Sequence, residues 1–529
     1  MQKLNRRQFL RNVGTGTLGL AGSAFLFNHI GCSTKRSGKR PNILFAFADD
    51  QSWQHTSAFG DKVVKTPAFD RVAREGVLFT HSFTACPSCT PSRSAVLTGQ
   101  DIWRLRQAGV LFGSLPLDFK LYPLILADAG YHIGYTGKGW LPGDWKALGL
   151  TRYPIGKQYN NRLEGTVAKG IDVRNYSANF EDFLADRPKG APFCFWFGST
   201  EPHRGYQKGI GRESGKRLED VEVPPFWPDV KEVRDDILDY YYEIEWFDSH
   251  LASIIAKLEE IGELDSTLIV VTSDNGMPFP RAKTTLYDWG TRMPLAIRWG
   301  DKVTGGRRID DFVCHTDFAP TFLEAAGIEI PREMTGRSLV PILLSGKEGL
   351  VARMRDRVFT AIERHTWCRP NGATYPVRAI RTREFLYLRN YEPDRWPTGG
   401  PTFVSSNKTF HGDVDACPTK SFMVDEANQK RFAEQYRLCF GKRSAEELYK
   451  ISDDPGQIHN LAGDPVYQEI KERLAVELEE HLTRTGDPRM EGRDPWQGYI
   501  YHQIHGYGAC FNMSLSAEER ARAALRPGN

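Results

Sequence analysis

The part of the chain best equipped for chemistry is residues 86–99, Cys-Pro-Ser-Cys-Thr-Pro-Ser-Arg-Ser-Ala-Val-Leu-Thr-Gly. Proline fixes its own φ and disfavours helical geometry in the residue before it, so Pro91 predicts that Cys89 is presented on a turn. Residues 92–97 predict a helix with Pro91 at its first position and Gly99 as its stop. The free N–H groups of this helix and the guanidinium of Arg93 would favour an anion beside Cys89.

Two other interpretations of this segment remain open. Cys89 could be a buried structural thiol, or Cys86 and Cys89 could form a redox pair of the thioredoxin type. A thioredoxin-like domain is short, whereas this chain has 529 residues and surrounds the motif with carboxylates, lysines and a histidine. That setting favours anion chemistry.

Acidic and amide side chains directly follow two runs that are typical of strands buried in a parallel sheet. Residues 43–48 are apolar and lead into Asp49 and Asp50, and residues 267–273 lead into Asp274 and Asn275. Ligands bind beyond the carboxyl ends of parallel strands, so we expect these four side chains to form a site. An all-oxygen set suits Ca²⁺ or Mg²⁺ better than Zn²⁺. A solvated turn is the alternative for the first pair.

Three further loops carry basic or imidazole groups. The expected strand-to-loop step at residues 130–140 contains Lys138, the apolar run 192–198 leads to His203, and the loop at 277–283 ends in Lys283. His203 is followed by Arg204, and a His-Arg pair is too polar for a core. We therefore interpret the loop after the apolar run as part of a site.

Residues 89–93, with Leu-Thr-Gly at 97–99, resemble the signature of the type I sulfatases, in which this cysteine is oxidised to formylglycine. Within that family the chain is most similar to the sulfamidases, the N-sulfoglucosamine sulfohydrolases, at residues 201–204, 273–280, 286–287, 447–449, 453–455 and 460–461. The resemblance extends from residue 42 to about residue 496. It implies an α/β fold like that of alkaline phosphatase, a sandwich with a large, mostly parallel central sheet between helices. A smaller C-terminal α+β subdomain with an antiparallel sheet would follow.

The resemblance also implies roles for the site residues. Formylglycine from Cys89 would be the nucleophile, and one Ca²⁺ would be held by the residue 89 side chain together with Asp49, Asp50, Asp274 and Asn275. The catalytic set would include Arg93, Lys138 and Lys283 on the sulfate and His203 as the acid for the leaving group. Substrate-binding roles are expected for Trp140, Arg204 and Arg281, and Arg281 is the local alternative to Lys283.

Trp140 departs from the family pattern, which has a histidine two residues after the lysine. Tryptophan has one N–H donor and no proton to exchange near neutral pH, so we expect it to wall the pocket and stack on a pyranose ring. The expected substrate is a terminal sulfated sugar, first N-sulfoglucosamine of heparan- or heparin-type chains. The alternatives are an O-sulfated algal or uronic glycan, a phosphoester or phosphonate substrate on the same fold, and an inactive glycan-binding protein.

The first forty residues predict export. Arg6 and Arg7 precede a weakly hydrophobic, glycine-rich run over residues 13–30, and the first acidic residue of the chain is Asp49. This pattern is typical of a twin-arginine signal and is too short and glycine-rich for a spanning helix, with a basic amphipathic N-terminus as the alternative. We expect a periplasmic or exported protein that uses the twin-arginine export machinery, with lipid anchoring at Cys32 left open. A formylglycine-generating or radical maturation enzyme would act before export.

Length and charge limit the remaining possibilities. The net charge is +3, and four basic residues of the leader leave 65 basic and 66 acidic residues elsewhere, which argues against nucleic acid as a partner. We expect a signal and linker over residues 1–40, a catalytic domain over 41–347, a C-terminal subdomain over 348–490 and an aromatic-rich tail over 491–529. Helices are predicted at 67–77, 121–129, 231–261 and 466–484, and strands at 78–83, 377–381 and 385–389.

Overall fold

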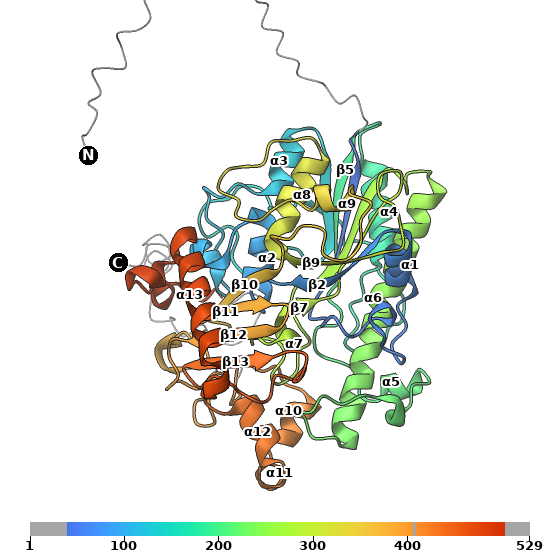
Figure 1. Ribbon diagram of the computed structural model, residues 1–529. Helices are drawn as coiled ribbons and strands as arrows, with labels where there is room; N and C mark the ends of the chain where they lie inside the picture. Colours follow the sequence, from blue (N-terminus) through green and yellow to red (C-terminus); the bar gives the residue numbers. More distant parts are fainter. Residues whose placement is uncertain (1–39, 406–408, 503–529) are drawn as a thin grey trace, which may run out of the picture. The chain divides into compact units, whose positions relative to one another are not determined.

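The computed structural model describes residues 40–405 and 409–502, so the predicted export signal and Cys32 lie outside the described residues. The central feature is a nine-stranded sheet of order β4-β3-β5-β1-β6-β8-β2-β7, with β9 beside β2 (Figure 1). Its strands are β1 (Asn42–Ala48), β2 (Val77–Phe83), β3 (His132–Gly137), β4 (Lys157–Gln158), β5 (Phe193–Gly198), β6 (Thr267–Ser273), β7 (Arg292–Met293), β8 (Ala296–Trp299) and β9 (Arg307–Cys314). Strands β4, β3, β5, β1 and β6 pair in parallel, and β8 and β7 join in antiparallel pairings. The expected mostly parallel sheet is confirmed.

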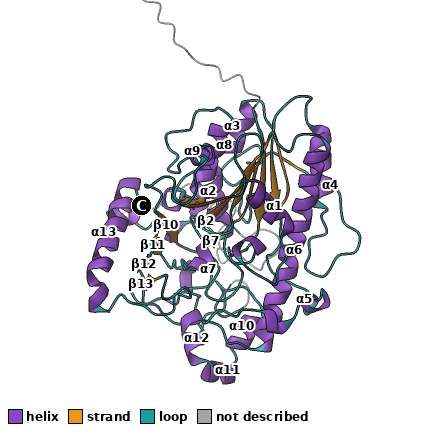
Figure 2. Cartoon of the chain, turned by 45° about the vertical axis from the view of Figure 1, so that its right-hand side comes forward, coloured by secondary structure: helices purple, strands orange, loops and turns teal. Residues whose placement is uncertain are grey.

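Helices cover both faces of this sheet (Figure 2). One face carries α1 (Pro67–Glu75), α4 (Tyr176–Asp186) and α6 (Lys231–Glu260), and the other carries α2 (Cys89–Thr98), α3 (Tyr122–Asp128) and α8 (Phe318–Ala325). In β1, Leu44 packs into the same cluster as Phe247 of α6, whereas Phe45 on the opposite face contacts Phe318 of α8. Because both faces are covered, this strand has no polar alternation.

The helix α2 differs from the expected turn at Cys89. Cys89 is its first residue, Ser88 precedes it in extended geometry, and Gly99 ends it with a φ of 64°. Pro91 therefore lies inside the first turn, where the missing N–H has no intrahelical acceptor to lose. The prediction that the helix starts after Cys89 was wrong by two residues.

A second, four-stranded antiparallel sheet contains β10 (Arg357–Ile362), β11 (Val377–Thr382), β12 (Phe385–Asn390) and β13 (Glu446–Lys450) in that order. Helix α13 (Gln468–Thr485) buries Leu474, Leu478 and Leu482 against this sheet, as Figure 1 shows at its left side. Between β12 and β13 lie α10 (Pro418–Met423), α11 (Glu426–Arg431) and α12 (Ala433–Phe440). The expected smaller antiparallel sheet is confirmed.

Hydrogen bonds tie this second sheet to the large one. The N–H of Ala361 donates to the carbonyl of Ala85 over 3.1 Å, and Arg381 donates to both carboxylate oxygens of Asp288 at 2.8 Å. These contacts connect the part of the chain before residue 347 with the part after it. The domain boundary expected at residue 347 stays a prediction.

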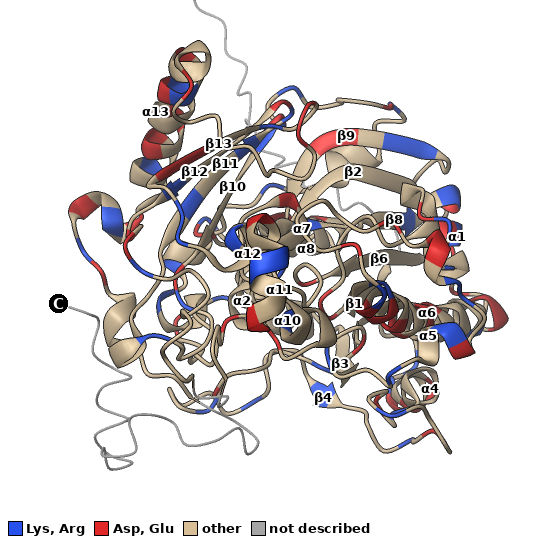
Figure 3. Ribbon diagram, turned by 90° about the horizontal axis from the view of Figure 1, so that it is seen from below, with Lys and Arg blue, Asp and Glu red and all other residues tan. Residues whose placement is uncertain are grey.

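Charged residues of both signs are interspersed on α1, α5 (Ile210–Glu213), α6 and α13 (Figure 3). Across residues 40–405 and 409–502, no helix has the length and apolar character needed to cross a bilayer.

Candidate active site

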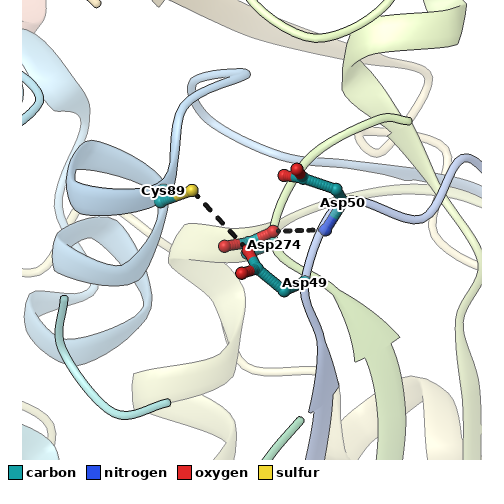
Figure 4. Close-up of side chains that lie close together, drawn as sticks. All are labelled: Asp49, Asp50, Cys89 and Asp274. Atoms are coloured by element: carbon teal, nitrogen blue, oxygen red, sulfur yellow. Dashed lines mark hydrogen bonds between the residues drawn. The ribbon is translucent and has the colours of Figure 1, made fainter. Parts of the chain in front are cut away.

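The site lies where β1 and β6 end. Ala48 pairs with Ser273, so Asp49 and Asp50 leave β1 beside the point where Asp274 leaves β6 (Figure 4). The N–H of Asp50 donates to Asp274 Oδ1 over 3.1 Å. One carboxylate oxygen from each aspartate and the Sγ of Cys89 all lie within 4.8 Å of one another. The parallel register thus brings together side chains that are over 220 residues apart in sequence.

Asp50 has an unusual backbone conformation. Its φ of 72° lies in the left-handed region, and its carbonyl accepts a hydrogen bond from the Tyr240 hydroxyl over 3.1 Å. The N–H of Ser52 donates to the same hydroxyl over 3.3 Å. Such a conformation costs on the order of 1–3 kcal/mol and persists where its surroundings hold it, often at functional sites. The tyrosine of α6 therefore helps to fix the turn that presents Asp50.

Cys89 approaches the carboxylates from the buried start of α2. Its Sγ lies 3.6 Å from Asp49 Oδ1, and 3% of the residue is exposed. The Ser92 hydroxyl donates to the carbonyl of Asp274 over 2.6 Å, which fastens the helix to the end of β6. Burial raises the pKa of the Cys89 thiol well above its ordinary value. An unmodified Cys89 is therefore a poor nucleophile at neutral pH.

Each of the three carboxylates is paired with its own cation. Lys138 Nζ lies 2.5 Å from Asp49 Oδ2, and Lys283 Nζ lies 2.7 Å from Asp50 Oδ2. Arg93 donates from Nε to Asp274 Oδ2 over 2.9 Å, and the rest of its guanidinium contacts the carbonyls of residues 138 and 139. The structure thus brings all three predicted cations to the predicted acidic cluster.

Close backbone approach places Lys138. Gly137 has a φ of 73°, and a Cβ at that position would lie 2.0 Å from the carbonyl oxygen of Gly198 in β5. That same carbonyl accepts the Lys138 N–H over 2.6 Å. A side chain at residue 137 would push β3 away from β5 and move Lys138 off the site.

The chemistry of the donor set fits a hard divalent cation. Burial acts to raise the pKa of Asp49, but the Lys138 ammonium and other cations hold it well below its usual range. Burial and the neighbouring Asp49 carboxylate raise the pKa of Asp274. The Oδ1 atom of Asn275 is buried without a hydrogen-bond partner in the described part of the chain. Three carboxylates and an unused amide oxygen are the ligands that Ca²⁺ or Mg²⁺ takes.

His203 lies at the edge of the cluster on the loop after β5. Its Nδ1 is 2.7 Å from the carbonyl of Arg204, and its Nε2 is 3.8 Å from Asp50 Oδ2. The side chain is 28% exposed, whereas Asp50 is fully buried. A carbonyl partner requires the proton on Nδ1, so Nε2 is the nitrogen left to face a substrate.

Two further polar residues reach the site from the C-terminal part of the chain. Asp415 lies 3.3 Å from Lys283 Nζ, and His365 Nδ1 is 2.8 Å from the Ser88 hydroxyl. Sequence analysis did not single out either residue. His365 comes three residues after β10, a strand that sequence analysis did not predict, and Asp415 lies in the loop before α10. Both are about 280 or more residues from Cys89, so no signal near the cysteine motif marks them.

Trp140 does not take the place expected for it. The residue is fully buried, and its indole N–H donates to the Ser94 hydroxyl over 2.8 Å. Its ring fills space next to Gly143, where a Cβ would lie 2.7 Å from the indole. The predicted stacking of a sugar on Trp140 is contradicted, because its ring packs inside the protein.

The two predicted substrate-binding arginines are also occupied by structural contacts. Arg204 binds both carboxylate oxygens of Asp236 and lies over the ring of Phe279 at 4.1 Å. Arg281 is buried and donates to the carbonyls of Leu438 and Gln457. Their guanidinium groups hold neighbouring loops together, so Lys283 is the basic residue of its loop that reaches the acidic cluster.

Aromatic residues from distant segments pack around Cys89 instead. This aromatic wall is a buried cluster that contains Leu111, Phe112, Trp367 and Tyr501 together with Cys89. Phe112 and Tyr501 are 4.8 Å apart between ring centroids. Apolar surroundings of this kind exclude water from the residue 89 side chain.

Residues 41–328 match the family model described as Sulfatase. The chain belongs to the sulfatase family. Residues 281–397 also match the model described as N-sulphoglucosamine sulphohydrolase, C-terminal. Sulfatases of this family generally use a formylglycine and a divalent metal, and Asp49, Asp50, Cys89 and Asp274 of this chain are close enough together to hold a metal ion. The fold expected from the resemblance is confirmed.

Relatives of known activity are similar over most of the sulfatase chain. An ulvan-active sulfatase of Formosa agariphila is 28% identical over 494 residues, covering 89% of each chain. The human N-sulphoglucosamine sulphohydrolase is 28% identical over 493 residues, covering 84% of this chain and 91% of its own. A solved structure in complex with its substrate D-glucosamine-2-N,6-O-disulfate has a TM-score of 0.62 and 22% identity, covering 86% and 100% of the two chains. This last likeness concerns the fold alone.

Proposed function

We propose that this sulfatase releases sulfate from a sulfated glycan, with N-sulfoglucosamine of heparan- or heparin-type chains as the first substrate, through a formylglycine at residue 89 and one Ca²⁺. One observation carries the proposal. The residue 89 side chain, three carboxylates and three cations converge in one buried cluster. The similarity to the human sulfamidase and to its C-terminal model supports the choice of substrate.

The charge of the cluster is suited to a sulfate. Asp49, Asp50 and Asp274 are matched by Arg93, Lys138 and Lys283, and Asp415 beside Lys283 leaves these side chains with one net negative charge. A bound divalent cation makes the cluster positive. The resulting positive potential attracts an anionic sulfate. The low effective dielectric constant of a buried site strengthens that attraction.

Different side chains of the cluster have different roles in the proposed cleavage. Formylglycine at residue 89 would supply a hydroxyl nucleophile, and a divalent cation held by the acidic cluster and Asn275 would withdraw electron density from the sulfate oxygens. Lys138 and Lys283 each have three N–H donors, so both can hold an aspartate and still donate to a sulfate oxygen. Arg93 holds Asp274 in place. His203 Nε2 faces the open side and delivers a proton to the leaving atom.

The first experiment measures the mass of the peptide that contains residue 89, together with sulfate release. We expect the aldehyde mass at residue 89, complete loss of activity in Cys89→Ala and nearly full activity in Cys86→Ser. Burial raises the pKa of the Cys86 thiol, and both cysteines are free thiols in the structure, which disfavours the redox interpretation. Equal loss in the two variants, with a disulfide mass, would contradict the sulfatase chemistry.

An O-sulfated algal or uronic glycan is the alternative substrate. The Formosa agariphila relative is named for activity on ulvan and is as similar as the human sulfamidase. A panel of N-sulfoglucosamine, glucosamine 6-sulfate and sulfated uronic oligosaccharides separates the two choices. Turnover of O-sulfated sugars alone would replace the first substrate and leave the sulfatase assignment intact.

A further inference from the structure

Asp415 borders the open side of the cluster. The ligand atoms of Asp50, His203 and Asp415 all lie within 4.8 Å of one another. Asp50 is fully buried, whereas the side chains of Asp415 and His203 are 25% and 28% exposed. Asp415 and His203 are therefore the partly exposed members of this group, on the side from which solvent reaches it.

The segment that carries Asp415 is held on both sides. Asp413 accepts hydrogen bonds from the N–H and the hydroxyl of Thr366 over 2.7 and 2.8 Å and pairs with Arg369 at 2.7 Å. Lys420 Nζ donates to the carbonyl of Val414 over 2.7 Å. These contacts fix the backbone around Asp415, so its carboxylate is positioned before a substrate arrives.

Asp415 is not needed as a ligand for a second cation. The Lys283 ammonium already lies between Asp50 at 2.7 Å and Asp415 at 3.3 Å. The Asp415 Oδ2 atom makes this ion pair without a hydrogen bond in the described residues. Burial opposes ionisation, yet Lys283, His203 and His365 hold the pKa of Asp415 below its usual range. Asp415 is therefore an ionised carboxylate that can still accept a hydrogen bond from a substrate.

An anionic acceptor beside the leaving atom distinguishes nitrogen from oxygen. A sulfamate nitrogen carries an N–H that can donate to a carboxylate, whereas the bridging oxygen of a sulfate ester offers only lone pairs. A site that hydrogen-bonds a substrate N–H discriminates strongly against an analogue that lacks it. The carboxylate also repels the ester oxygen, which adds selection against the wrong substrate.

We propose that Asp415 accepts a hydrogen bond from the sulfamate N–H and selects N-sulfated over O-sulfated sugars. The proposal rests on the proposed function. When sulfur is attacked at residue 89, the S–N bond breaks and its electron pair stays on nitrogen. That nitrogen takes one proton from Nε2 of a protonated His203 and becomes an amine. At neutral pH the released amino sugar binds a further proton from water, and Asp415 pairs with the resulting ammonium.

A binding experiment tests this role without turnover. Calorimetry compares glucosamine, N-acetylglucosamine and glucose on the wild-type enzyme, on Asp415→Asn and on Asp394→Asn, an exposed aspartate with no role in the site. We expect glucosamine to bind the wild type and Asp394→Asn at least about 10-fold more tightly than glucose. Glucose has no ammonium group and cannot form the charge-assisted hydrogen bond with the Asp415 carboxylate. Asp415→Asn should remove that preference, and Asp415→Glu should restore part of it. Equal affinity of the wild type for glucosamine and glucose overturns the proposal.

A kinetic comparison provides the second readout. Asp415→Asn should lower kcat/KM for N-sulfoglucosamine by roughly 10- to 150-fold and change that for glucosamine 6-sulfate by less than about 3-fold. Equal loss on both substrates overturns the proposal, because Asp415 would then act only by holding Lys283. A wild type active on O-sulfated sugars alone also overturns it and leaves the sulfatase assignment intact. Activity on neither sugar contradicts the proposed function, and the binding comparison then decides the role of Asp415.

Discussion

Asp274 is the residue through which most of the active site is connected. Its carboxylate accepts hydrogen bonds from the Asp50 N–H and from Arg93, and its carbonyl accepts the Ser92 hydroxyl. It therefore links β1, β6 and α2 at one point. A change at this side chain should therefore disturb the acidic cluster, the position of Cys89 and the side chain of Arg93 together.

We predict that Asp274→Ala lowers bound metal from one ion per chain to near zero and reduces sulfate release by at least about 100-fold, since both a ligand and the partner of Arg93 are lost. Chelation of the wild type should lower its Tm, because ligand binding stabilises the folded state. Elemental analysis and thermal unfolding measure the two effects, with Asp394→Ala as the control. Full metal content in Asp274→Ala would refute the assignment of this ligand.

Trp140 has the opposite character, because its role is structural. We predict that Trp140→Phe costs about 1 kcal/mol through loss of the hydrogen bond to Ser94, and that Trp140→Ala costs about 3–5 kcal/mol through the cavity it leaves. Denaturant unfolding measures both costs. KM for the glycan should not change in Trp140→Phe, and a raised KM at unchanged stability would return the tryptophan to the sugar site.

The residues that sequence analysis placed well are those whose position follows from a strand end. Asp49, Asp50, Asp274 and Asn275 come together because buried apolar runs mark their strands and parallel strands end at one edge. Trp140 was misassigned because sequence spacing does not say toward which side a side chain points. Asp415 was missed because only tertiary contacts bring it to Lys283.

At the scale of elements, helix α6 holds two of the loops that carry site residues. Tyr240 fixes the turn at Asp50, and Asp236 holds Arg204 on the His203 loop. Glu243 is 1% exposed on the same helix, and one of its carboxyl oxygens has no hydrogen-bond partner in the described residues. Burial, followed by the charge of Glu201, raises the pKa of Glu243 to about 9.

This shift predicts a pH-dependent stability. Above the ordinary pKa of 4.5 the unfolded chain releases the Glu243 proton, whereas the folded chain keeps it until about pH 9. The folded state binds more protons in this window, so its stability falls as the pH rises. We predict that Glu243→Gln removes this contribution, so that its Tm advantage over the wild type grows between pH 5 and pH 9. Glu232→Gln, exposed on the same helix, is the control, and a constant difference would contradict the prediction.

Elements with a strong sequence pattern were predicted, and those without one were not. The apolar runs of β1, β5 and β6 and the long amphipathic α6 were found to within one or two residues. Strand β9 was missed because its sequence, Arg-Arg-Ile-Asp-Asp-Phe-Val-Cys, has neither an apolar run nor clean alternation. It is a strand because it pairs with β2, which is a tertiary cause.

At the scale of the whole molecule, the last described residues complete a site that the first ones begin. Trp496 is fully buried, and Tyr499 and Tyr501 are almost so. Tyr501 belongs to the aromatic wall around Cys89. The site therefore depends on contacts between both ends of the described chain.

We predict that a chain ending at residue 490 loses several kcal/mol of stability and most of its sulfate release, because buried aromatic side chains are removed from the core and from the wall. A chain ending at residue 502 is the reference, so the difference between the two shortened chains measures the contribution of residues 491–502. Thermal unfolding and sulfate release are the measurements. Equal stability of the two shortened chains would show that these aromatic contacts contribute little.

Export remains a proposal for the leader, which lies outside the described residues. We predict that Arg6→Lys with Arg7→Lys leaves the precursor in the cytoplasm, because the twin-arginine machinery reads both guanidinium groups. Cell fractionation with an antibody to the enzyme measures this. Cys32→Ser should release the protein from the membrane fraction if that cysteine is lipidated, and unchanged export of the double lysine variant would reject the twin-arginine signal.

The burial of Cys89 sets an order of events during biosynthesis. A modifying enzyme needs access to the thiol, yet 3% of the residue is exposed once Trp367 and Tyr501 have packed around it. About 400 residues must be translated after Cys89 before Tyr501 exists, which takes roughly 20–80 s at about 5–20 residues per second. Under the proposed maturation, oxidation at residue 89 competes with folding, and slower translation or a delayed C-terminus should raise the fraction of matured enzyme.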